Sequence, residues 1–523
     1  MSLLRSLAAL ALAASAAAAQ APADAYDVVI RNGRVLDGAG NPWVRADVGI
    51  RGDRIAAVGD LSGARAARVI DAAGRYVAPG FIDTHSHAGP GLASAALSGA
   101  APLLAQGITT AVVNPDGGGP TDLAAQRGRL EAARPGVNVG LMVPHGSVRG
   151  AVLGAADRQA TPAEMDRMRA LVRAGMEAGA FGLSSGPFYA PGSYASTEEL
   201  VALAREAGAR GGVYQSHIRD ESDYTVGVEA AVDEVIRVAR EGRLPGVVTH
   251  IKALGPNVWG KSASLVARID AARAAGVEVW ADQYPYEASG TSLSASLLPR
   301  WAEAGGRDSL RARMADPATR DRLRRDMAAN LQRRGGPARL QFQRYAPDPS
   351  LEGKNLQQAA EARGADPLDV ALDMIGRGGA GVTSFNMDST DIATLMRQPW
   401  TMTASDGDLV PMHQGVPHPR AYGTFPRKLG KYARDERTVG LEHAVRSMTG
   451  LPAAVFRVRD RGAIRPGAYA DVVVFDLAAV RDPATYTQPH RLAEGMAWVL
   501  VNGRVALEDG RATDARAGAV LRR

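Results

Sequence analysis

Two patterns of apolar and polar residues divide the chain into flanks and a centre. In the flanks the two kinds of residue alternate in short runs between Gly-rich turns, as in YDVVIRNGRVLDGAG at 26–40 and MAWVLVNGRVALEDGR at 496–511. Such alternation is typical of half-buried β-strands. The flanks also share the similar segments RNGRVLDG and VNGRVALEDG. We therefore predict one small β-sandwich built from both chain ends, residues 26–78 and 456–523.

Between the flanks, short apolar strands alternate with amphipathic helices. This order predicts an α/β fold with a parallel sheet and right-handed crossovers. Eight candidate strands follow one another: APGFIDTH, GITTAVVN, NVGLMVP, GAFGLSS, GGVYQSHI, GVVTHIK, VEVWADQY and TMTASD. Eight such units predict a TIM (β/α)8 barrel over 79–455, with its active site at the carboxyl ends of the strands. The long segment from about 288 to 381 is expected to form a small inserted domain that caps this site.

Composition indicates a large globular protein. The 523 residues are 46% hydrophobic and 22% charged, which is enough for a large core and more than one domain. The net charge of +6 comes from 61 Lys and Arg against 55 Asp and Glu, spread along the chain. The densest basic run, 311–334, contains Asp and Met but no aromatic stacking residues. We interpret it as a solvated helical face and expect no nucleic-acid partner.

Residues 1–19 predict export. One early Arg precedes an apolar run that ends in Ala17, Ala18 and Ala19, the pattern of a secretory signal peptide with its cleavage site. No later run of 18 or more apolar residues suggests a membrane span. We expect a secreted or periplasmic protein. Because the sequence has no Cys, neither a disulfide nor a thiolate metal ligand can form.

Four histidines at the ends of predicted strands indicate a metal site. His85 and His87 stand two residues apart in FIDTHSHAG after the first strand, so they face the same side. His217 ends the fifth strand and His250 the sixth. Since the ends of barrel strands meet at one rim, these imidazoles could together hold a divalent metal. The other histidines are interpreted as supporting or structural (His145) or as loop or surface residues: His413, His418, His443 and His490.

Two aspartates at strand ends are candidates for chemistry. Asp406 lies at the tip of the eighth strand in TMTASDGD. A carboxylate there could take a proton from a metal-activated water and pass it to a leaving group, although it could also cap a helix or form a turn. Asp116 lies in VVNPDGGG after the second strand. Pro-Asp-Gly is a strong turn signal, so the local sequence by itself indicates an ordinary turn.

These segments resemble the amidohydrolase superfamily and, within it, the N-acyl-D-amino-acid deacylases, also called D-aminoacylases. The resemblance covers essentially the whole chain after residue 19. It rests on seven segments in this order: APGFIDTHSH, QGITTAVV, YQSHIRDE, THIKALG, DQYPYEASGT, ASDG and HPRAYGTFPRKLG. The H-x-H pair is shared by many reactions, whereas SHIRDE, HPRxYGTFPR and DxYPYxAS together are narrow.

The resemblance implies a role for each matching residue. His85 and His87 would bind a first metal position, which in this group can be weak or vacant. His217 and His250 would bind a second, tight zinc position, and Asp406 would be the proton shuttle. The substrate carboxylate would be bound from four positions: Lys252, Tyr284, Arg420 and, nearby, Ser289. Tyr286 competes with Tyr284 for this role.

One position departs from the family pattern. These deacylases commonly carry Cys after the second strand, in a Gly-Asn-Cys-Gly turn, where the thiolate binds or bridges metal. This chain has Asp116 there. Zinc also accepts a carboxylate oxygen, and the fourth strand, GAFGLSSG, has no Lys for the carbamate bridge of some amidohydrolases. We therefore expect Asp116 to be a metal ligand.

Zinc-dependent hydrolysis of a linear amide is the function that the resemblance implies, with one or two ions. The expected substrate is a small molecule with a free carboxylate, an N-acyl-D-amino acid that is split into a carboxylate and a D-amino acid. A dipeptidase for peptides with a D-residue, or a cyclic amidase, is the enzymatic alternative. A metal-free binding protein is the other alternative, but such a protein should have lost ligands that this sequence keeps.

Overall fold

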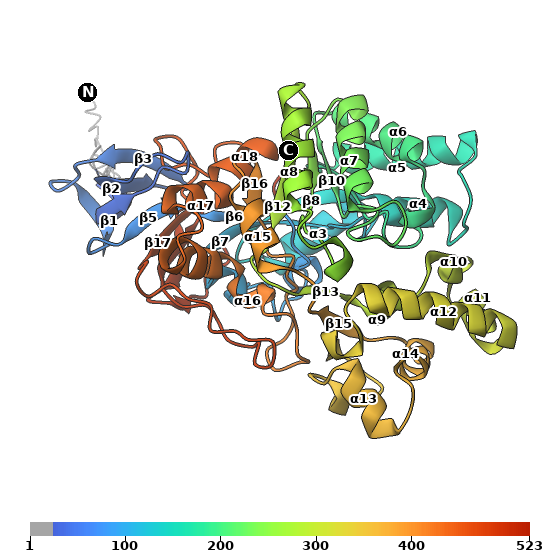
Figure 1. Ribbon diagram of the computed structural model, residues 1–523. Helices are drawn as coiled ribbons and strands as arrows, with labels where there is room; N and C mark the ends of the chain where they lie inside the picture. Colours follow the sequence, from blue (N-terminus) through green and yellow to red (C-terminus); the bar gives the residue numbers. More distant parts are fainter. Residues whose placement is uncertain (1–24) are drawn as a thin grey trace, which may run out of the picture.

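The computed structural model describes residues 25–523; the expected signal segment lies outside this part. At its centre is a parallel sheet of eight strands in the order β16-β12-β11-β10-β9-β8-β7-β6. They are β6 (Phe81–Asp83), β7 (Ile108–Val113), β8 (Asn138–Pro144), β9 (Gly182–Ser185), β10 (Val213–Ser216), β11 (Gly246–Val248), β12 (Val279–Gln283) and β16 (Thr401–Thr403). Each lies within one of the eight expected segments, so the predicted barrel is confirmed (Figure 1).

The two outer strands of this sheet meet just beyond their carboxyl ends. The Asp406 backbone N–H donates to the His85 carbonyl at 2.8 Å, and the His87 N–H donates to the Gly407 carbonyl at 3.0 Å. These bonds join the segment after β6 to the segment after β16. Because both segments carry predicted site residues, closure of the barrel brings those residues together.

Helices cover the outside of the barrel. The longer ones are α3 (Leu123–Ala133), α4 (His145–Leu153), α5 (Pro162–Glu177), α6 (Thr197–Gly208), α7 (Val228–Gly242), α8 (Ser262–Ala274) and α15 (Ser389–Met396). Further helices follow β6 and β16: α1 (Gly89–Leu92), α2 (Ala101–Leu104), α16 (Arg420–Arg427), α17 (Leu441–Met448) and α18 (Gly450–Val455). In α7, residues 228, 231, 232, 235 and 239 are buried, the spacing of a helix with one apolar face. Within residues 25–523, no helix has both the length and the hydropathy needed to cross a bilayer.

Both ends of the chain contribute to a second sheet of nine strands. The amino-terminal part supplies β1 (Ala25–Val35), β2 (Val44–Arg51), β3 (Arg54–Gly59), β4 (Arg65–Asp71) and β5 (Tyr76–Pro79). The carboxyl-terminal part supplies β17 (Val472–Phe475), β18 (Met496–Val501), β19 (Arg504–Glu508) and β20 (Arg511–Ala512). The two parts join where β17 pairs antiparallel with β5, and apolar side chains from both form one core. In Figure 1 the blue and red strands accordingly lie side by side.

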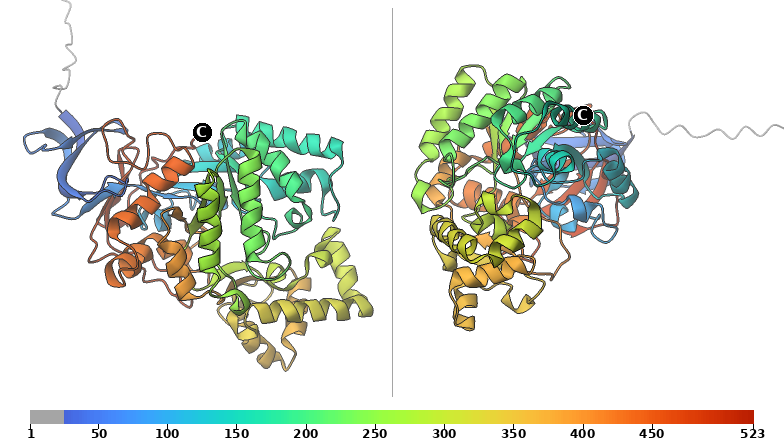
Figure 2. Two further views of the ribbon diagram at one scale, coloured as in Figure 1. Left: turned by 45° about the horizontal axis from the view of Figure 1, so that its top comes forward. Right: turned by 90° about the vertical axis from the view of Figure 1, so that its right-hand side faces the viewer.

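The long segment between the last two barrel strands forms the inserted domain. Its three-stranded antiparallel sheet has the order β13-β15-β14, and its apolar core is separate from that of the barrel. The elements are β13 (Ser289–Ser292), α9 (Leu293–Leu297), α10 (Arg300–Glu303), α11 (Gly306–Ala315), α12 (Pro317–Arg333), β14 (Leu340–Arg344), α13 (Leu356–Arg363), α14 (Pro367–Gly376) and β15 (Gly381–Ser384). Figures 1 and 2 (left) show this domain and the nine-stranded sheet on opposite sides of the barrel.

Candidate metal centre and active site

The predicted site residues all follow the carboxyl ends of barrel strands. His85 and His87 follow β6, Asp116 follows β7, His217 follows β10, His250 follows β11 and Asp406 follows β16. All of them except the fully buried His85 line one cavity of about 1090 Å³. The cavity extends from these residues to the inserted domain, because β13 and β14 also contribute to its wall. A buried polar cluster at the strand ends of a barrel is the expected place for catalysis.

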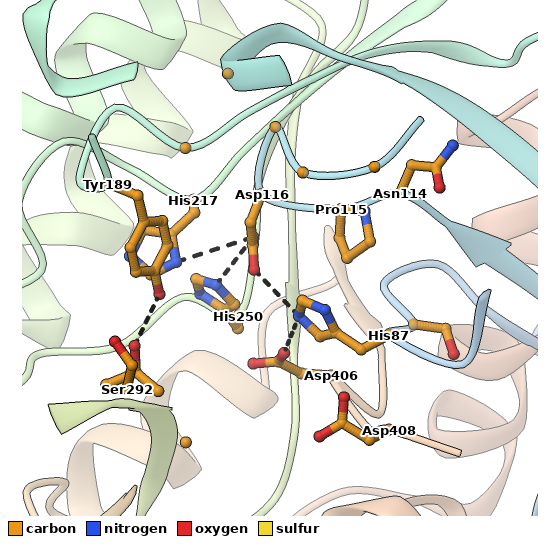
Figure 3. A pocket seen from close by; sticks show the side chains of 18 of the residues that line it. His87, Asn114, Pro115, Asp116, Tyr189, His217, His250, Ser292, Asp406 and Asp408 are labelled. Carbon is orange, nitrogen blue, oxygen red and sulfur yellow. Dashed lines mark hydrogen bonds and ion pairs between the residues drawn. The ribbon is translucent and has the colours of Figure 1, made fainter. Parts of the chain in front are cut away.

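Asp116 lies at the centre of the cluster. Its Oδ2 is 3.2 Å from His87 Nε2, and its Oδ1 is 3.3 Å from His85 Nε2. The same Oδ1 is 3.6 Å from His250 Nε2 and 3.9 Å from His217 Nδ1. Figure 3 shows the carboxylate between His87 on one side and His217 and His250 on the other. Asp116 thus belongs to both groups of residues that could hold an ion, one with His85, His87 and Asp406 and one with His217 and His250.

The residues of the cluster fit a divalent cation. Among the described residues, His85 Nε2, Asp116 Oδ1 and both ring nitrogens of His217 are buried and have no hydrogen-bond partner. Burial lowers the pKa of His217 to about 3, so its ring is neutral, as a zinc ligand must be. Burial by itself raises the pKa of Asp116, but His85, His250 and His87 outweigh this effect and hold the pKa well below its ordinary value. In contrast, burial by itself lowers the pKa of His87, but Asp116 and Asp406 outweigh this effect and raise it. Against burial, Glu221 and Asp116 raise the pKa of His250 to about 9. Imidazole nitrogens and carboxylate oxygens are both ligands that zinc accepts.

The backbone at the centre is held in an uncommon conformation. Asp116 has φ of 56°, His250 36° and Asp406 51°, all in the left-handed region. For residues other than glycine this costs about 1–3 kcal/mol each and persists only where the surroundings enforce it. At Asp116 the surroundings include Gly186, where a Cβ atom would lie 2.3 Å from the Asp116 carbonyl oxygen. Asp116 therefore lies in the turn that its neighbours predict, and that turn directs its carboxylate into the cluster.

Glu221 orients one of the histidines. Its Oε1 lies 3.0 Å from His250 Nδ1 and also accepts a hydrogen bond from Lys252 Nζ. With a metal at Nε2, His250 would carry its proton on Nδ1 and could donate it to Glu221. Burial raises the pKa of Glu221, but Lys252, His217 and His250 outweigh this effect and lower it. Sequence reasoning missed Glu221, although its place four residues after His217 in SHIRDE is a signal that could have found it.

We expect Glu221→Gln to weaken zinc binding by about 10- to 100-fold, the usual effect of removing a residue that orients a ligand. The amide cannot hold the His250 proton in the same way, and it leaves the Lys252 ammonium buried without a countercharge. Competition with a chelator of known affinity measures the change. Glu229→Gln is the matched control, because it breaks a Glu–Lys pair with Lys261 (2.6 Å) whose two residues do not line the cavity. Equal zinc affinity in the two variants would refute this role.

Asp406 faces both the metal cluster and a cation. Its Oδ1 is 3.1 Å from His87 Nε2, and its Oδ2 is 2.7 Å from Arg420 Nη1. Burial raises the pKa of Asp406, but Arg420 and His85 outweigh this effect and hold it below its ordinary value. Asp406 is therefore a carboxylate with one oxygen bound by a guanidinium and the other directed to the cluster.

His418 lies in a loop, one of the two alternatives that the sequence left open, but it is buried there rather than at the surface. Its Nδ1 accepts the Arg420 backbone N–H at 3.0 Å, and its Nε2 donates to the Ala288 carbonyl at 2.9 Å. Burial and the nearby Arg420 lower its pKa well below the ordinary value, so the ring is neutral and can make both bonds. His418 thus fixes the start of α16 against the start of the inserted domain. A second buried histidine, His145, pairs with Glu199 at 3.0 Å and has a structural role.

The predicted substrate-binding residues all line the cavity, although two of them already have partners. Arg420 is paired with Asp406, and the Lys252 ammonium contacts Glu221 and His250 Nδ1. Tyr284 and Ser289 also line the cavity.

Tyr286 does not line the cavity, because its hydroxyl donates to Asp482 Oδ2 at 2.7 Å. Of the two tyrosines, the structure therefore favours Tyr284. One cavity residue that the sequence did not indicate is Tyr189, whose ring centroid lies 4.6 Å from that of His217.

Comparison with known proteins places this geometry in a family. The profile described as "Amidohydrolase family" matches residues 68–507. The chain belongs to the amidohydrolase family. The predicted resemblance is thereby confirmed, and so is the fold that it implies.

Other amidohydrolases resemble the chain along nearly its whole length. The chain is 40% identical to an N-acyl-D-glutamate deacylase of Alcaligenes xylosoxydans xylosoxydans, over 95% of this chain and 96% of that one. It superposes with a TM-score of 0.82 on a D-aminoacylase studied for its binuclear metal center, at 37% identity, covering 95% and 100%. It also superposes with a TM-score of 0.81 on the N-acyl-D-glutamate deacylase of Bordetella bronchiseptica, at 36% identity, covering 95% of this chain and 100% of that one. That structure is a complex with zinc and a phosphonate mimic of the tetrahedral intermediate.

Proposed function

We propose that this amidohydrolase cleaves the amide bond of N-acyl-D-amino acids, releasing a carboxylate and a D-amino acid. The observation that carries the proposal is the position of Asp406, which lies 3.1 Å from His87 in the metal cluster and 2.7 Å from Arg420. Asp406, a possible proton carrier, thus lies between the residues that could hold a metal and Arg420, whose guanidinium could bind a substrate carboxylate. The similarity to D-aminoacylase and N-acyl-D-glutamate deacylase supports the same substrate class.

The side chains divide the reaction between them. A divalent ion held by His85, His87, Asp116, His217 and His250 would polarise the scissile carbonyl and make a water more acidic. Asp406 would accept the proton of the attacking water on Oδ1, because Oδ2 is occupied by Arg420. It would then deliver that proton to the departing amine nitrogen, as a general acid must.

The α-carboxylate of the substrate is assigned to Arg420 and Tyr284. The guanidinium lies 4.8 Å from the centre of the Tyr284 ring, so the two side chains form one wall of the cavity. A planar guanidinium offers two parallel donors to a carboxylate. Lys252 and Ser289 stand in the same wall and would complete the contact.

A substrate panel tests the proposal. Protein loaded with zinc is expected to release amino acid from N-acetyl-D-amino acids but not from their L-enantiomers or from α-amide analogues without a free carboxylate. Dipeptides with a D-residue, hydantoins and dihydropyrimidines belong in the same assay. Faster turnover of any of these three would replace the proposal with the dipeptidase or cyclic-amidase alternative.

We also propose that the enzyme acts outside the cytoplasm. The support is the sequence of residues 1–19, which has the pattern of a secretory signal peptide. Fractionation of cells that express the full chain, followed by amino-terminal sequencing of the mature protein, tests this. Retention in the cytoplasm with Met1 or Ser2 at the amino terminus would refute it.

A further inference from the structure

Arg334, directly after α12 in the inserted domain, is a buried cation in the wall of the catalytic cavity. It ends the basic run 311–334, which the sequence indicates to be a solvated face, yet only 1% of its surface is exposed. Its Nε donates to the Ser296 carbonyl at 3.3 Å. Its Nη1 donates to the amide oxygen of Asn386 at 3.3 Å, in the amide orientation that pairs donors with acceptors. Both of these acceptors are neutral.

Arg334 differs in this respect from the other two buried cations of the cavity. Lys252 is paired with Glu221, and Arg420 with Asp406. Within residues 25–523, no carboxylate forms an ion pair with Arg334. Burial of a charge without a countercharge is costly, and an arginine does not shed its proton to avoid that cost. A buried, unpaired guanidinium in the wall of a binding cavity is therefore a site for an anion.

The position of Arg334 is fixed by close packing between the inserted domain and the barrel. A Cβ atom on Gly255, in the segment after β11, would lie 2.1 Å from the carbonyl oxygen of Arg333. The Gly255 N–H also donates to the Asn386 carbonyl at 2.7 Å. The residues on both sides of the guanidinium are thus held against the barrel, so its place in the cavity is part of the fold.

Arg420 approaches Gly290 of β13, and Arg334 is connected to the preceding residue, Ser289, through the Asn386 amide. A Cβ atom on Gly290 would lie 3.0 Å from Arg420 Nη2. The preceding residue, Ser289, contacts the Asn386 amide that also contacts Arg334. The cavity therefore presents two guanidinium groups along one short stretch of its wall. Two carboxylates separated by a few bonds would match this arrangement.

We propose that Arg334 binds a second carboxylate, the one on the side chain of the substrate amino acid. This inference rests on the proposed function and narrows it to N-acyl derivatives of acidic D-amino acids, glutamate or aspartate. Arg420 takes the α-carboxylate and Arg334 the side-chain carboxylate. A neutral side chain leaves the Arg334 charge unpaired, so the site discriminates against it.

The test compares N-acetyl-D-glutamate with N-acetyl-D-glutamine, which has nearly the same shape without the second charge. For the zinc-loaded full-length protein we expect kcat/KM to favour the glutamate substrate by on the order of 10², the scale of a buried charge pair. Arg334→Gln should lose most of this preference. The loss should fall on the glutamate substrate and mainly on KM, because the contact is made before and during the reaction alike. Arg334→Lys keeps the charge and should retain part of the preference.

Arg333→Gln is the matched control. Arg333 is the neighbouring arginine, but it is already paired with Asp223 at 3.2 Å, and its side chain does not line the catalytic cavity. This variant should keep the preference for glutamate. Equal loss on both substrates in Arg334→Gln would show that Arg334 holds the α-carboxylate or the structure, and would overturn the inference. A wild type without preference would overturn it as well, even if Arg334→Gln fails to fold.

If the proposed function itself is wrong, the kinetic experiment gives a different result. In that case the wild type would hydrolyse neither substrate. Calorimetric titration with N-acetyl-D-glutamate and N-acetyl-D-glutamine then tests Arg334 without catalysis. Selective binding of the glutamate compound to wild type and Arg333→Gln, but not to Arg334→Gln, would support the anion site; equal binding of the two compounds would refute it.

Discussion

Replacement of Asp406 by Asn is expected to lower turnover by on the order of 10² or more, the usual scale of general acid–base catalysis. Asparagine keeps the size of the side chain and an oxygen for Arg420, but it cannot carry the proton from the attacking water to the amine. The zinc content should stay close to that of wild type, because Asp116, His217 and His250 form a ligand group without Asp406. Steady-state kinetics and elemental analysis of the same preparation measure both quantities.

Asp408→Asn is the control for this variant. Asp408 is two residues further along the same segment, is exposed at the cavity wall and belongs to neither ligand group, so its replacement removes an equal charge but no ligand and no carboxylate beside the cluster histidines. We expect near-normal turnover from it. If Asp406→Asn also keeps near-normal turnover, Asp406 is not the proton carrier. If it loses zinc as well as activity, Asp406 acts as a ligand.

Replacement of Asp116 should affect metal and activity together. Asparagine fits the turn, because it tolerates the left-handed backbone that Asp116 adopts at φ of 56°. It lacks the negative charge that offsets a divalent cation, so Asp116→Asn should be depleted in metal and poorly active. Asp116→Cys should be metal-loaded and at least partly active, since a thiolate is also a good zinc ligand.

Thermal unfolding separates this effect from damage to the turn. With zinc supplied, both Asp116 variants should unfold close to the wild-type temperature. A fully metallated and fully active Asp116→Asn would falsify the assignment of Asp116 as a ligand. The residue would then serve only the turn.

The barrel and the four histidines of its metal cluster could be predicted because both follow from local pattern, whereas Asp116 could be expected as a ligand only through the resemblance, since its own sequence indicates a turn. Each apolar strand segment is short and bounded, and a histidine or aspartate of the cluster follows five of the eight strands that meet at one rim. The residues that sequence reasoning misplaced depend instead on contacts between distant segments. Arg334 directly follows a helix with the pattern of a solvated face, and it is buried where this end of the helix packs against the segment at Gly255. His418 is buried for a similar reason, through Ala288 of the inserted domain.

The choice between Tyr284 and Tyr286 shows another limit of prediction from the sequence. In an extended strand, side chains two positions apart face the same side, so the sequence cannot tell which of the two tyrosines faces the cavity. The strand β12 ends at Gln283, and the Tyr286 N–H donates to the Tyr284 carbonyl at 3.1 Å. This three-residue turn sends Tyr284 into the cavity and Tyr286 toward Asp482. A turn of this kind has no clear signal in YPY.

The pairing of β5 with β17 can form only late in the synthesis of the chain. The ribosome makes β1–β5 first, then the entire barrel, and only then β17, so one edge of β5 stays open until the barrel has been made. An unpaired strand edge can recruit other chains and leads to aggregation. A nascent chain halted before Val472 would keep this edge open. Folding of the barrel therefore brings β17–β20 next to β1–β5. The nine-stranded sheet is the part of the molecule that is completed last.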